Sequence, residues 1–490
     1  MFCKITNNNA VKQFMNVTTR QKNSSETTEN DRISTIKSKN KDEIQSIINT
    51  QLDSFFEQYE SEKKAIPANF RKLVSWVPYS ESLTHYIHQY PAKLLKHIPI
   101  FFLNSRLVTK EGMVLDPFCG SGTVLLESIV AGKNAIGCDA NPIARLIAEV
   151  KTTPLSASEL SPYVLSVVRR AKSYRKYDLP NVVNINHWFP EHTQKSLSRL
   201  YRAINEVENE KHRKFLLVTF SNIIKKVSFC DPNLSVPVKL KAEKYTCPTY
   251  KSNIQSRINK IDSIEPFEVF ESELKQNILR MERLSELSIK NEAKIISVDA
   301  RKITRSIDSS HMLPDGSVDT IITSPPYAGA QKYIRASSLS LGWLDYCEKS
   351  TLRDFEKKNI GREHYSKSEY ESLPKLGISA ADTVLEKIGK KNKLRAYISF
   401  NYLLEMTEAI KECYRVLRNQ GYCVIVIGNN KVCGYDFKSS KYLKDIAESA
   451  GFSTKLVLID DIHSRGLMTK RNKTASIINS EWILVLQKNE

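Results

Sequence analysis

The chain has 490 residues, of which 41% are hydrophobic and 26% charged, as is typical of a globular protein with a buried core. Its formal net charge of +19 favours a polyanionic partner, because neutralising phosphates supplies most of the non-specific affinity for nucleic acids. The sequence has no run of eighteen apolar residues, no apolar segment near its start and no CxxC pair among its nine cysteines. These features argue against a membrane span, a secretory signal and a disulfide framework, and they predict a cytoplasmic protein.

Polar residues dominate the start of the chain, and apolar runs bounded by Gly and Pro follow them. Residues 1–50 are rich in Asn, Ser, Thr and Lys and are expected to form a disordered tail. Beyond this tail the pattern predicts strands separated by helices. Strands are expected at 113–115, 135–137, 294–298, 318–322, 422–427, 455–459 and 482–486. Helices are expected at 124–131, from Asn141 and Pro142 onward, at 397–418 and at 441–449.

Two segments interrupt this series. Residues 151–290 are largely helical in pattern, with a basic, loop-like stretch at about 231–260, and residues 345–395 are polar. The chain is therefore expected to divide into a first unit at 51–150, an insertion at 151–290 and a second unit at 291–490. Strands that alternate with helices predict an open, mainly parallel α/β sheet with both faces covered.

A glycine-rich turn, Asp116-Pro117-Phe118-Cys119-Gly120-Ser121-Gly122-Thr123, joins the first of these strands to a helix. Open α/β sheets bind ligands at the carboxyl ends of their strands. Gly120 and Gly122 can adopt a positive φ and let the backbone approach a ligand closely. Neither GxGxxG nor GxxxxGK[ST] occurs in the sequence, so a dinucleotide or nucleoside triphosphate is not favoured as the ligand.

This turn resembles motif I of the amino-methyltransferases of DNA and some RNA, which binds S-adenosyl-L-methionine. The resemblance implies a Rossmann-like, seven-stranded class I methyltransferase sheet with helices on both faces, plus the largely helical insertion. It also implies that the ends of the next two strands hold the ribose hydroxyls and the adenine amino group, for which a carboxylate is suited. The cofactor-binding candidates are Asp116, Phe118, Gly120, Gly122, Thr123, Asp139 and Asp299.

Upstream, His88-Gln89-Tyr90-Pro91-Ala92-Lys93 precedes an apolar helix and resembles motif X of the same enzymes, which lies beside the cofactor. Tyr90 to Lys93 are therefore further candidates. His85, His88 and His97 have no acidic or cysteine partners at ligand spacing, so no metal site is expected.

Thr323-Ser324-Pro325-Pro326-Tyr327 follows the fourth strand, and its two prolines cannot continue a central strand. An exocyclic amine is a poor nucleophile because its lone pair is delocalised, and acceptors aimed at its protons stabilise the developing charge. A Pro-Pro turn presents carbonyls at fixed positions, Ser324 adds an oxygen, and Tyr327 offers a face for a flipped base. The string resembles motif IV of the DNA amino-methyltransferases, so Ser324, Pro325, Pro326 and Tyr327 are the catalytic candidates.

The Ser form of motif IV is commonest among cytosine-N4 enzymes, whereas the Asp and Asn forms are commoner among adenine-N6 enzymes. The resemblance therefore implies a site-specific enzyme that methylates N4 of cytosine in double-stranded DNA, within a restriction-modification system that has a cognate restriction endonuclease. Residues 51–150 would bind the cofactor, 151–290 would recognise the target, and 291–490 would carry catalysis. Three alternatives stay open: an N6-adenine DNA methyltransferase, an RNA guanine-N2 methyltransferase, and a non-catalytic nucleic-acid-binding subunit.

Two further segments resemble this group: Cys413-Tyr414-Arg415-Val416-Leu417 before Gly421, and the closing hairpin from Arg465-Gly466 to Glu481-Trp482. Many cytosine-N4 enzymes carry motif IV before the glycine turn, whereas the glycine turn comes first in this chain. Trp343 is expected to be a core anchor, and the polar segment 345–395 to close over the flipped base. Residues expected to contact DNA in the first insertion are Lys225, Lys226, Lys239, Lys241, Lys244, Tyr245, Tyr250, Lys251, Arg257 and Lys260.

Overall fold

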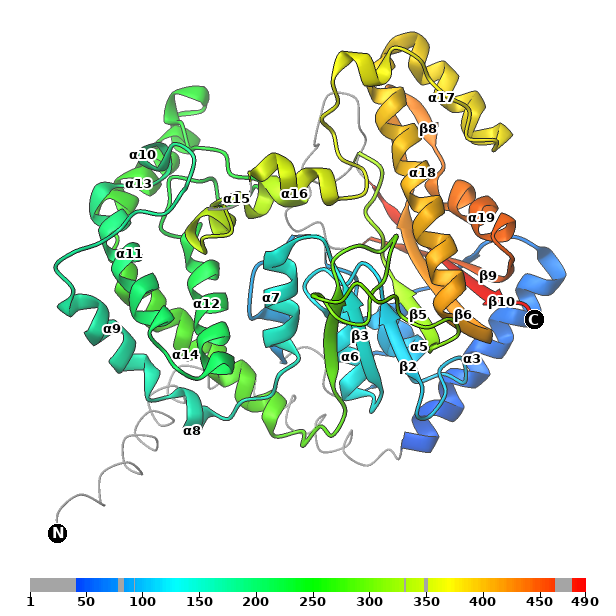
Figure 1. The fold of residues 1–490 in the computed structure, drawn as a ribbon, viewed down its shortest axis with the longest axis horizontal. Helices are drawn as coiled ribbons and strands as arrows, with labels where there is room; N and C mark the ends of the chain where they lie inside the picture. The colour runs from blue at the N-terminus through cyan, green and yellow to red at the C-terminus, as the bar shows by residue number, and fades with distance from the viewer. Residues whose placement is uncertain (1–40, 78–82, 92, 330–331, 348–350, 463–477) are drawn as a thin grey trace.

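The structure is a computed structural model that describes residues 41–77, 83–91, 93–329, 332–347, 351–462 and 478–490 (Figure 1). Within these ranges no helix is both long and apolar enough to cross a membrane. The eight cysteines in the same ranges are free thiols, and five of them are buried, as expected for small core residues. Residues 1–40 of the expected tail and Arg465-Gly466 lie outside the described part of the chain.

An eight-stranded sheet forms the centre of the molecule, in the order β1-β9-β10-β6-β5-β2-β3-β4 (Figure 1). Neighbouring strands are parallel except at β10, which is antiparallel to β6 and β9. The seven expected strands are therefore confirmed, and β1 is an eighth. The strands are β1 (Ile66–Pro67), β2 (Met113–Asp116), β3 (Asn134–Cys138), β4 (Ala293–Ser297), β5 (Val318–Thr323), β6 (Leu417–Gly428), β9 (Phe452–Asp461) and β10 (Ser480–Lys488).

Helices and a short ribbon surround this sheet. The helices are α3 (Lys41–Glu62), α4 (Phe70–Leu73), α5 (His97–Leu103), α6 (Thr123–Val130), α7 (Pro142–Lys151), α15 (Tyr333–Trp343), α16 (Leu352–Lys358), α17 (Ser379–Lys391), α18 (Lys393–Val416) and α19 (Ser439–Ser449), with 3-10 turns η2 (Thr84–Tyr86) and η4 (Lys367–Tyr370). The ribbon pairs β7 (Asn430–Val432) with β8 (Tyr435–Phe437). As predicted, Asn141 caps α7 by accepting from Ile143 N at 3.1 Å, and Pro142 is the first helical residue.

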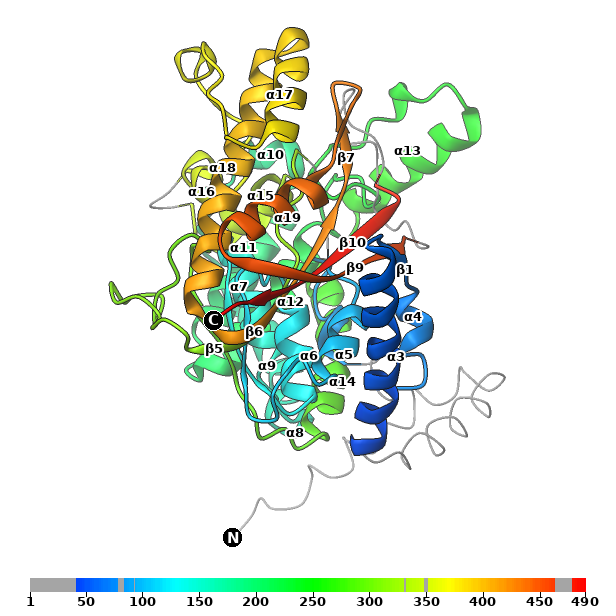
Figure 2. The same ribbon diagram turned by 90° about the vertical axis from the view of Figure 1, so that its right-hand side faces the viewer.

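The strand order reverses between β2 and β5. From β2 the chain adds β3 and β4 toward one edge, and from β5 it adds β6 toward the other edge. Because crossovers between parallel strands are right-handed, the helices of the two series cover opposite faces. In agreement, α6 contacts β2, β3 and β4, whereas α18 and α19 contact β6 (Figure 2). A reversal of this kind is where open α/β sheets bind ligands.

Residues 151–290 form the predicted helical insertion, which lies beside α7 (Figure 1). Its core extends to Trp343 of α15, which is fully buried. The ring centroid of Trp343 lies 5.5 Å from that of Phe189 and 6.2 Å from that of Phe220, so its role as a core anchor is confirmed. The helices are α8 (Ala157–Leu160), α9 (Tyr163–Ser173), α10 (Ile185–Trp188), α11 (Glu191–Asn205), α12 (Glu210–Ile224), α13 (Pro248–Asp262) and α14 (Pro266–Ser285), with the 3-10 turn η3 (Ala242–Lys244).

Two sequence-based boundaries were wrong. The expected tail does not reach residue 50, because α3 begins at Lys41 and buries Ile44, Ile48 and Leu52 at a spacing of four residues. The stretch 231–260 is not a loop throughout, because α13 begins at Pro248, where proline is favoured as a first helical residue.

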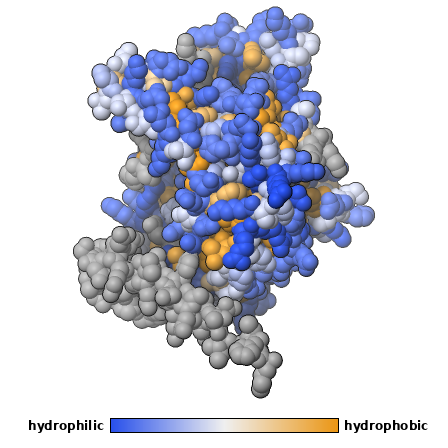
Figure 3. All heavy atoms as spheres, turned by 90° about the vertical axis from the view of Figure 1, so that its left-hand side faces the viewer, coloured by the Kyte–Doolittle hydropathy of each residue, from blue (hydrophilic) through white to orange (hydrophobic). Residues whose placement is uncertain are grey.

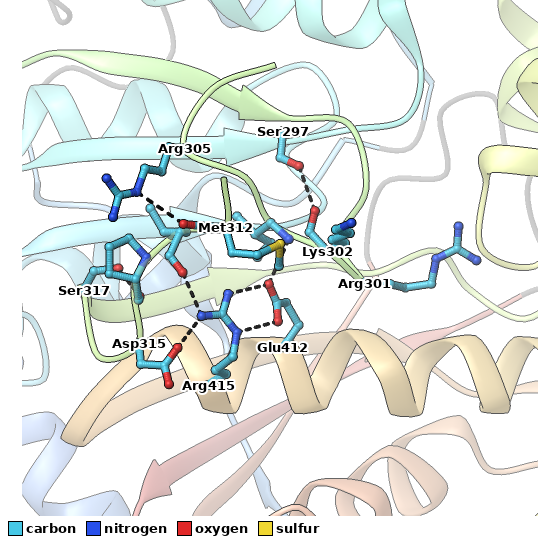
Figure 4. A network of polar contacts seen from close by, with 12 residues as sticks. Ser297, Arg301, Lys302, Arg305, Met312, Asp315, Ser317, Glu412 and Arg415 are labelled. Atoms are coloured by element: carbon cyan, nitrogen blue, oxygen red, sulfur yellow. Dashed lines mark hydrogen bonds and ion pairs between the residues drawn. The ribbon is translucent and has the colours of Figure 1, made fainter. Parts of the chain in front are cut away.

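The segment around Arg415 fixes the long loop between β4 and β5 (Figure 4). Arg415 donates two 2.8 Å hydrogen bonds to the carboxylate of Glu412 and one of 2.7 Å to the carbonyl of Leu313. Glu412 also accepts from Ile303 N at 2.8 Å. Bidentate pairs of this kind are geometrically specific, so α18 holds the loop that follows Asp299.

Trp343→Ala is expected to lower the free energy of unfolding by about 3–5 kcal/mol, because it removes a large side chain from a closed core. Urea unfolding followed by circular dichroism would measure the change. Leu165→Ala is the matched control, since Leu165 is 62% exposed and its truncation leaves no cavity. Equal losses in the two variants would contradict the role of Trp343 as an anchor.

Candidate active site

A pocket opens at the carboxyl ends of β2, β3, β4 and β5. It encloses about 610 Å³ including its open mouth, within the range of about 300–1,000 Å³ typical of small-molecule sites. Strand ends that are far apart in the sequence thus meet at the point where the strand order reverses. The predicted residues that line the pocket are Tyr90, Phe118, Gly120, Asp139, Asp299, Ser324 and Pro326.

The other predicted residues, Asp116, Gly122, Thr123, Pro325 and Tyr327, do not line the pocket. Asp116 is buried behind it and accepts hydrogen bonds from Thr323 Oγ1 at 2.6 Å and from Phe118 N at 3.1 Å. Burial raises the pKa of Asp116 to about 7, although both hydrogen bonds oppose this rise. Asp116 therefore joins the glycine turn to the strand that carries motif IV.

The two glycines of the turn have different roles. Gly120 has a φ of 49° and faces the pocket, so its backbone is open to a ligand. Gly122 has a φ of 76°, and a Cβ atom there would lie 2.9 Å from the Cα of Ala148. Gly122 is thus required for the close approach of α7 rather than for ligand contact. The next residue, Thr123, is buried at the first position of α6.

Asp139 lies on the pocket wall, and its carboxylate also supports the turn. Oδ2 accepts from Gly120 N at 2.9 Å, and Oδ1 accepts from Asn141 N at 2.8 Å. Burial raises the pKa of Asp139, and these two hydrogen bonds lower it. Because a carboxylate oxygen has more than one lone pair, both oxygens can still accept from a ligand hydroxyl.

Asp299 is held by a bidentate pair with Arg301, in which both contacts measure 2.9 Å. Arg301 also donates to Glu405 Oε1 of α18 at 3.1 Å. The second oxygen of Glu405 accepts from Gly361 N at 3.0 Å. Glu405 therefore ties the polar insertion to the end of β4, a connection that the sequence pattern did not reveal.

Nine pocket-lining residues are not among the predicted site residues: Pro117, Cys138, Ala140, Val298 and Ala300, which adjoin predicted residues at the strand ends, and Tyr333, Lys358, Asn359 and Ile360. Lys358, Asn359 and Ile360 belong to the insertion at 345–395, which the sequence predicts to close over the flipped base. This insertion contributes to the same wall as Phe118 and Asp139.

The segment that resembles motif X is fixed by side-chain contacts. Tyr90 lines the pocket, and its hydroxyl accepts from Asn141 Nδ2 at 3.2 Å. Lys93 Nζ donates to the carbonyls of His85 and His88 at 2.7 and 2.8 Å, so it stabilises its own turn instead of reaching the pocket. Ala92 lies outside the described residues.

The three histidines of this region are not arranged for a metal ion, and no group of three or more potential metal ligands occurs in the described part of the chain. His85 Nε2 contacts Glu127 at 2.6 Å, and His88 Nε2 contacts Ser221 Oγ at 3.0 Å. Both histidines are buried, and burial lowers the pKa of His88 to about 3. They are therefore structural polar groups.

Tyr327 is placed differently from the prediction of an open stacking face. Its ring packs over Gly428, where a Cβ atom would approach Cε2 of the ring to 2.8 Å. The Tyr327 hydroxyl donates to Glu481 Oε1 at 2.8 Å and hydrogen-bonds to the side chain of Ser324. Ser324, by contrast, faces the pocket.

Of the ten residues of the first insertion predicted to contact DNA, three make contacts within the insertion, Lys239 and Tyr245 are half-buried, and five are exposed. Lys225 donates to the carbonyl of Leu234, Lys226 pairs with Glu273, and Arg257 donates to the carbonyl of Lys226, so these three serve the insertion itself. The outer face of the insertion is mainly hydrophilic (Figure 3). The expected residues that are exposed are Lys241, Lys244, Tyr250, Lys251 and Lys260.

Comparison with known proteins places these residues in context. Residues 4–149 and 318–490 match the N6_N4_Mtase family, described as DNA methylase. The chain is 25% identical over 431 residues to Type II methyltransferase M.MvaI of Kocuria varians, over 83% of this chain and 92% of that protein. It is 23% identical to Type II methyltransferase M.BsoBI of Geobacillus stearothermophilus, over 77% of this chain and 81% of that protein. A solved SAM-dependent methyltransferase of Methanosarcina mazei aligns over 78% of this chain and 95% of its own, at 10% identity and a TM-score of 0.28.

Asp116→Asn is expected to change how stability depends on pH. The pKa of the Asp116 carboxyl is about 7 in the folded protein and about 4 in the unfolded chain. Its contribution to stability is therefore fully present below pH 4 and is lost as the pH rises through 7. The difference in unfolding free energy, variant minus wild type, should therefore increase by up to a few kcal/mol from pH 5 to pH 8. Denaturant titrations of the ligand-free proteins would measure it.

Asp436→Asn removes an exposed carboxylate and is the matched control for this experiment. A difference for Asp116→Asn that does not vary with pH would contradict a protonated Asp116 in the ligand-free chain.

Proposed function

We propose, because the chain belongs to the N6/N4 family of DNA methylases, that it transfers a methyl group from S-adenosyl-L-methionine to N4 of cytosine in double-stranded DNA. The observation that carries this proposal is one pocket shared by two turns. Gly120 and Asp139 line it from the cofactor side, and Ser324 and Pro326 line it from the catalytic side. Methyl transfer requires such proximity between donor and acceptor.

The residues present fit the methyl donor. Gly120 gives the open backbone position that the methionine part needs, and Asp139 offers carboxylate oxygens to the ribose hydroxyls. Asp299, oriented by Arg301, lies at the third strand end and is suited to the adenine amino group. When bound, the donor supplies a methyl group on a positively charged sulfur, which is open to attack by a nitrogen lone pair.

On the catalytic side, the chain must prepare a poor nucleophile. Ser324 presents a side-chain oxygen to the pocket, and the two prolines hold the backbone carbonyls of the turn in place. Acceptors aimed at the amine protons draw the nitrogen lone pair out of the ring and stabilise positive charge as it develops. Pro326 and Tyr333 border the space that a flipped base would enter.

The choice of cytosine rests on Ser324, since the Ser form of motif IV is commonest among cytosine-N4 enzymes. N6 of adenine is the second candidate. Family membership favours DNA over RNA, and an intact pocket favours an enzyme over a non-catalytic subunit. The relatives M.MvaI and M.BsoBI are Type II methyltransferases, which supports a cognate restriction endonuclease as partner.

We propose that the first insertion, residues 151–290, recognises the target sequence in the DNA. Lys241, Lys244 and Lys251 are exposed beside Tyr250, which is itself 56% exposed. Lysines with an adjacent aromatic ring suit contacts to phosphates and bases.

Pro326→Ala is expected to lower the rate of methyl transfer about 100-fold, because a displaced turn misaligns nitrogen, methyl carbon and sulfur. The assay is transfer of labelled methyl from S-adenosyl-L-methionine to duplex DNA, followed by identification of the modified nucleoside. The wild type should yield N4-methylcytosine, and Leu287→Ala, a change at an exposed position, should match it.

The chemical identity of the methylated nucleoside distinguishes the candidate functions from one another. N6-methyladenine would overturn the choice of base, and transfer to RNA alone would overturn the choice of substrate. Absence of transfer to every nucleic acid tested would favour a non-catalytic subunit, and an unaltered rate in Pro326→Ala would contradict the role of the turn.

A further inference from the structure

Three side chains form a hydrogen-bonded line that leads from the pocket into the sheet. Ser324 lines the pocket and hydrogen-bonds to the Tyr327 hydroxyl. Burial raises the pKa of the Tyr327 phenol well above its usual range, the charge of Glu481 raises it further, and the hydrogen bond with Ser324 opposes this rise. Tyr327 in turn donates to Glu481 Oε1 at 2.8 Å. Because the Tyr327 hydroxyl donates to Glu481, its oxygen is free to accept from Ser324 Oγ, and the line can carry a proton from the pocket toward Glu481.

The pairing of β10 with β6 determines where Tyr327 and Glu481 meet. Glu481 is paired with Gly428 in the antiparallel ladder between β10 and β6. The ring of Tyr327 lies over Gly428, where a Cβ atom would come within 2.8 Å of the ring. A glycine opposite Glu481 thus lets the phenol lie flat on β6 and brings its hydroxyl to the carboxylate.

The carboxylate of Glu481 is suited to accept a proton. Burial raises the pKa of Glu481, and the nearby charge of Asp460 raises it further. The hydrogen bond from Tyr327 and the charge of Arg71 oppose this rise. Asp460 comes from β9 and Arg71 from α4, so charged groups face Glu481 from two elements besides the catalytic turn. A raised pKa makes the ionised form a stronger base than an exposed carboxylate.

We propose that Glu481 is the final acceptor of the proton that the target amine releases, and that Ser324 and Tyr327 relay this proton. The proposal rests on the proposed function and adds a residue to it. Ser324 would touch the substrate, whereas Glu481 acts through Tyr327 and is a positioning residue for the reaction.

The amine nitrogen forms a bond to the methyl carbon as the carbon–sulfur bond breaks, and its electron pair stays on sulfur. The methylated amine then carries a positive charge and donates one proton to Ser324 Oγ. Ser324 passes its own proton to Tyr327 Oη, and Tyr327 passes its proton to the carboxylate of Glu481, which becomes a neutral acid and later releases the proton to water.

Glu481→Gln separates this role from a merely structural one. The amide oxygen of Gln still accepts the hydrogen bond from Tyr327, so the turn stays in place, but Gln cannot take up a proton. We expect the single-turnover rate of methyl transfer to fall by about 100-fold or more, the usual contribution of proton transfer to catalysis. The affinity for S-adenosyl-L-methionine, measured by calorimetry, should stay unchanged and would show that the fold is intact.

The pH dependence gives a second readout. The wild-type rate should rise with pH as Glu481 ionises, because the protonated acid cannot accept, and this rise should be missing in Glu481→Gln. The titration of Asp116 is common to both proteins, so their difference isolates Glu481. Glu481→Asp should retain part of the rate that Glu481→Gln loses. Tyr327→Phe should lower the rate as much as Glu481→Gln does, and the double variant Tyr327→Phe, Glu481→Gln should be only slightly slower than either one.

A wild-type rate and profile in Glu481→Gln would overturn the relay while leaving the proposed function standing. Absence of methyl transfer in the wild type would instead overturn the proposed function.

A different observation supports a second inference. A concave surface, here called the lysine groove, is lined by the end of α3, the ribbon β7–β8 that follows β6, the start of α19 and the first half of β10. It encloses about 1,400 Å³ including its open mouth. Five lysines line it together with a single acid, Asp436, and these lysines are Lys63, Lys431, Lys438, Lys441 and Lys444.

The lysine groove is strongly basic and is connected to the catalytic turn. Lys438 and Lys441 are exposed and form no ion pair with any residue that the structure describes. Asn430 lines the groove, and its Nδ2 donates to the carbonyl of Ala328 at 2.5 Å, directly after Tyr327. This hydrogen bond joins the wall of the groove to the segment that follows motif IV.

We infer that the lysine groove binds the phosphate backbone of the duplex that flanks the target base. This inference also rests on the proposed function. Charge complementarity supports it: Lys63, Lys431 and Lys444 are paired with Glu60, Asp436 and Glu448, whereas the exposed Lys438 and Lys441 are left to meet an anion. Phosphate contacts fix the register of a protein on DNA.

The test is the double variant Lys438→Ala, Lys441→Ala, with a random-sequence duplex of about 30 base pairs as the probe. Each phosphate contact contributes a slope of about −0.9 to the dependence of log affinity on log salt concentration. The double variant should therefore reduce the slope by about 2 relative to the wild type. Lys110→Ala, Lys290→Ala is the matched control, because these exposed lysines precede β2 and β4 and so lie at the amino ends of the strands, away from the carboxyl ends that form the pocket.

An unaltered slope in the groove variant, or an equal change in the control, would overturn the inference. Methylation of DNA by the wild type is measured separately, so a failure of the proposed function would be recognised as such.

Discussion

One hydrogen bond, from Thr323 Oγ1 to Asp116 Oδ1 at 2.6 Å, joins the two halves of the active site. Both side chains are buried, and either one left unpaired would carry the full cost of its desolvation. The bond lies where the strand order reverses, so it fixes the ends of β2 and β5 relative to each other. The glycine turn and the proline turn are therefore held as one unit, although 207 residues separate the two partners.

The main strands could be predicted because each is a short apolar run ended by a polar residue or glycine, which is a local signal. β1 and α3 could not be predicted in the same way. β1 has two residues and exists only by pairing with Leu458 and Ile459 of β9. α3 is polar in composition, and what stabilises it is the burial of Ile48 and Leu52 against a core built by later segments.

The same distinction applies to the site. Ser324, Pro326 and Gly120 belong to contiguous strings, so a reading of the sequence finds them together. Glu405 and Glu481 contact Arg301 and Tyr327, which are 104 and 154 positions away, and no local pattern marks such carboxylates as different from surface ones. Long-range partners of this kind become visible only when the register of the sheet is known, as the pairing of Glu481 with Gly428 illustrates.

The insertion at 151–290 is part of the same physical unit as the pocket. Its core is continuous with α7 and with the segment before Tyr90, so no break in packing marks its start. Three buried or partly buried hydrogen bonds join it to that segment: His88 Nε2 with Ser221 Oγ, Gln89 N with Asn222 Oδ1, and Asn277 Nδ2 with the carbonyl of Ile87. Because Tyr90 lines the pocket, a displacement of α12 or α14 would move a wall of the cofactor site. Continuous packing of side chains therefore connects the core of the insertion with the wall of the pocket.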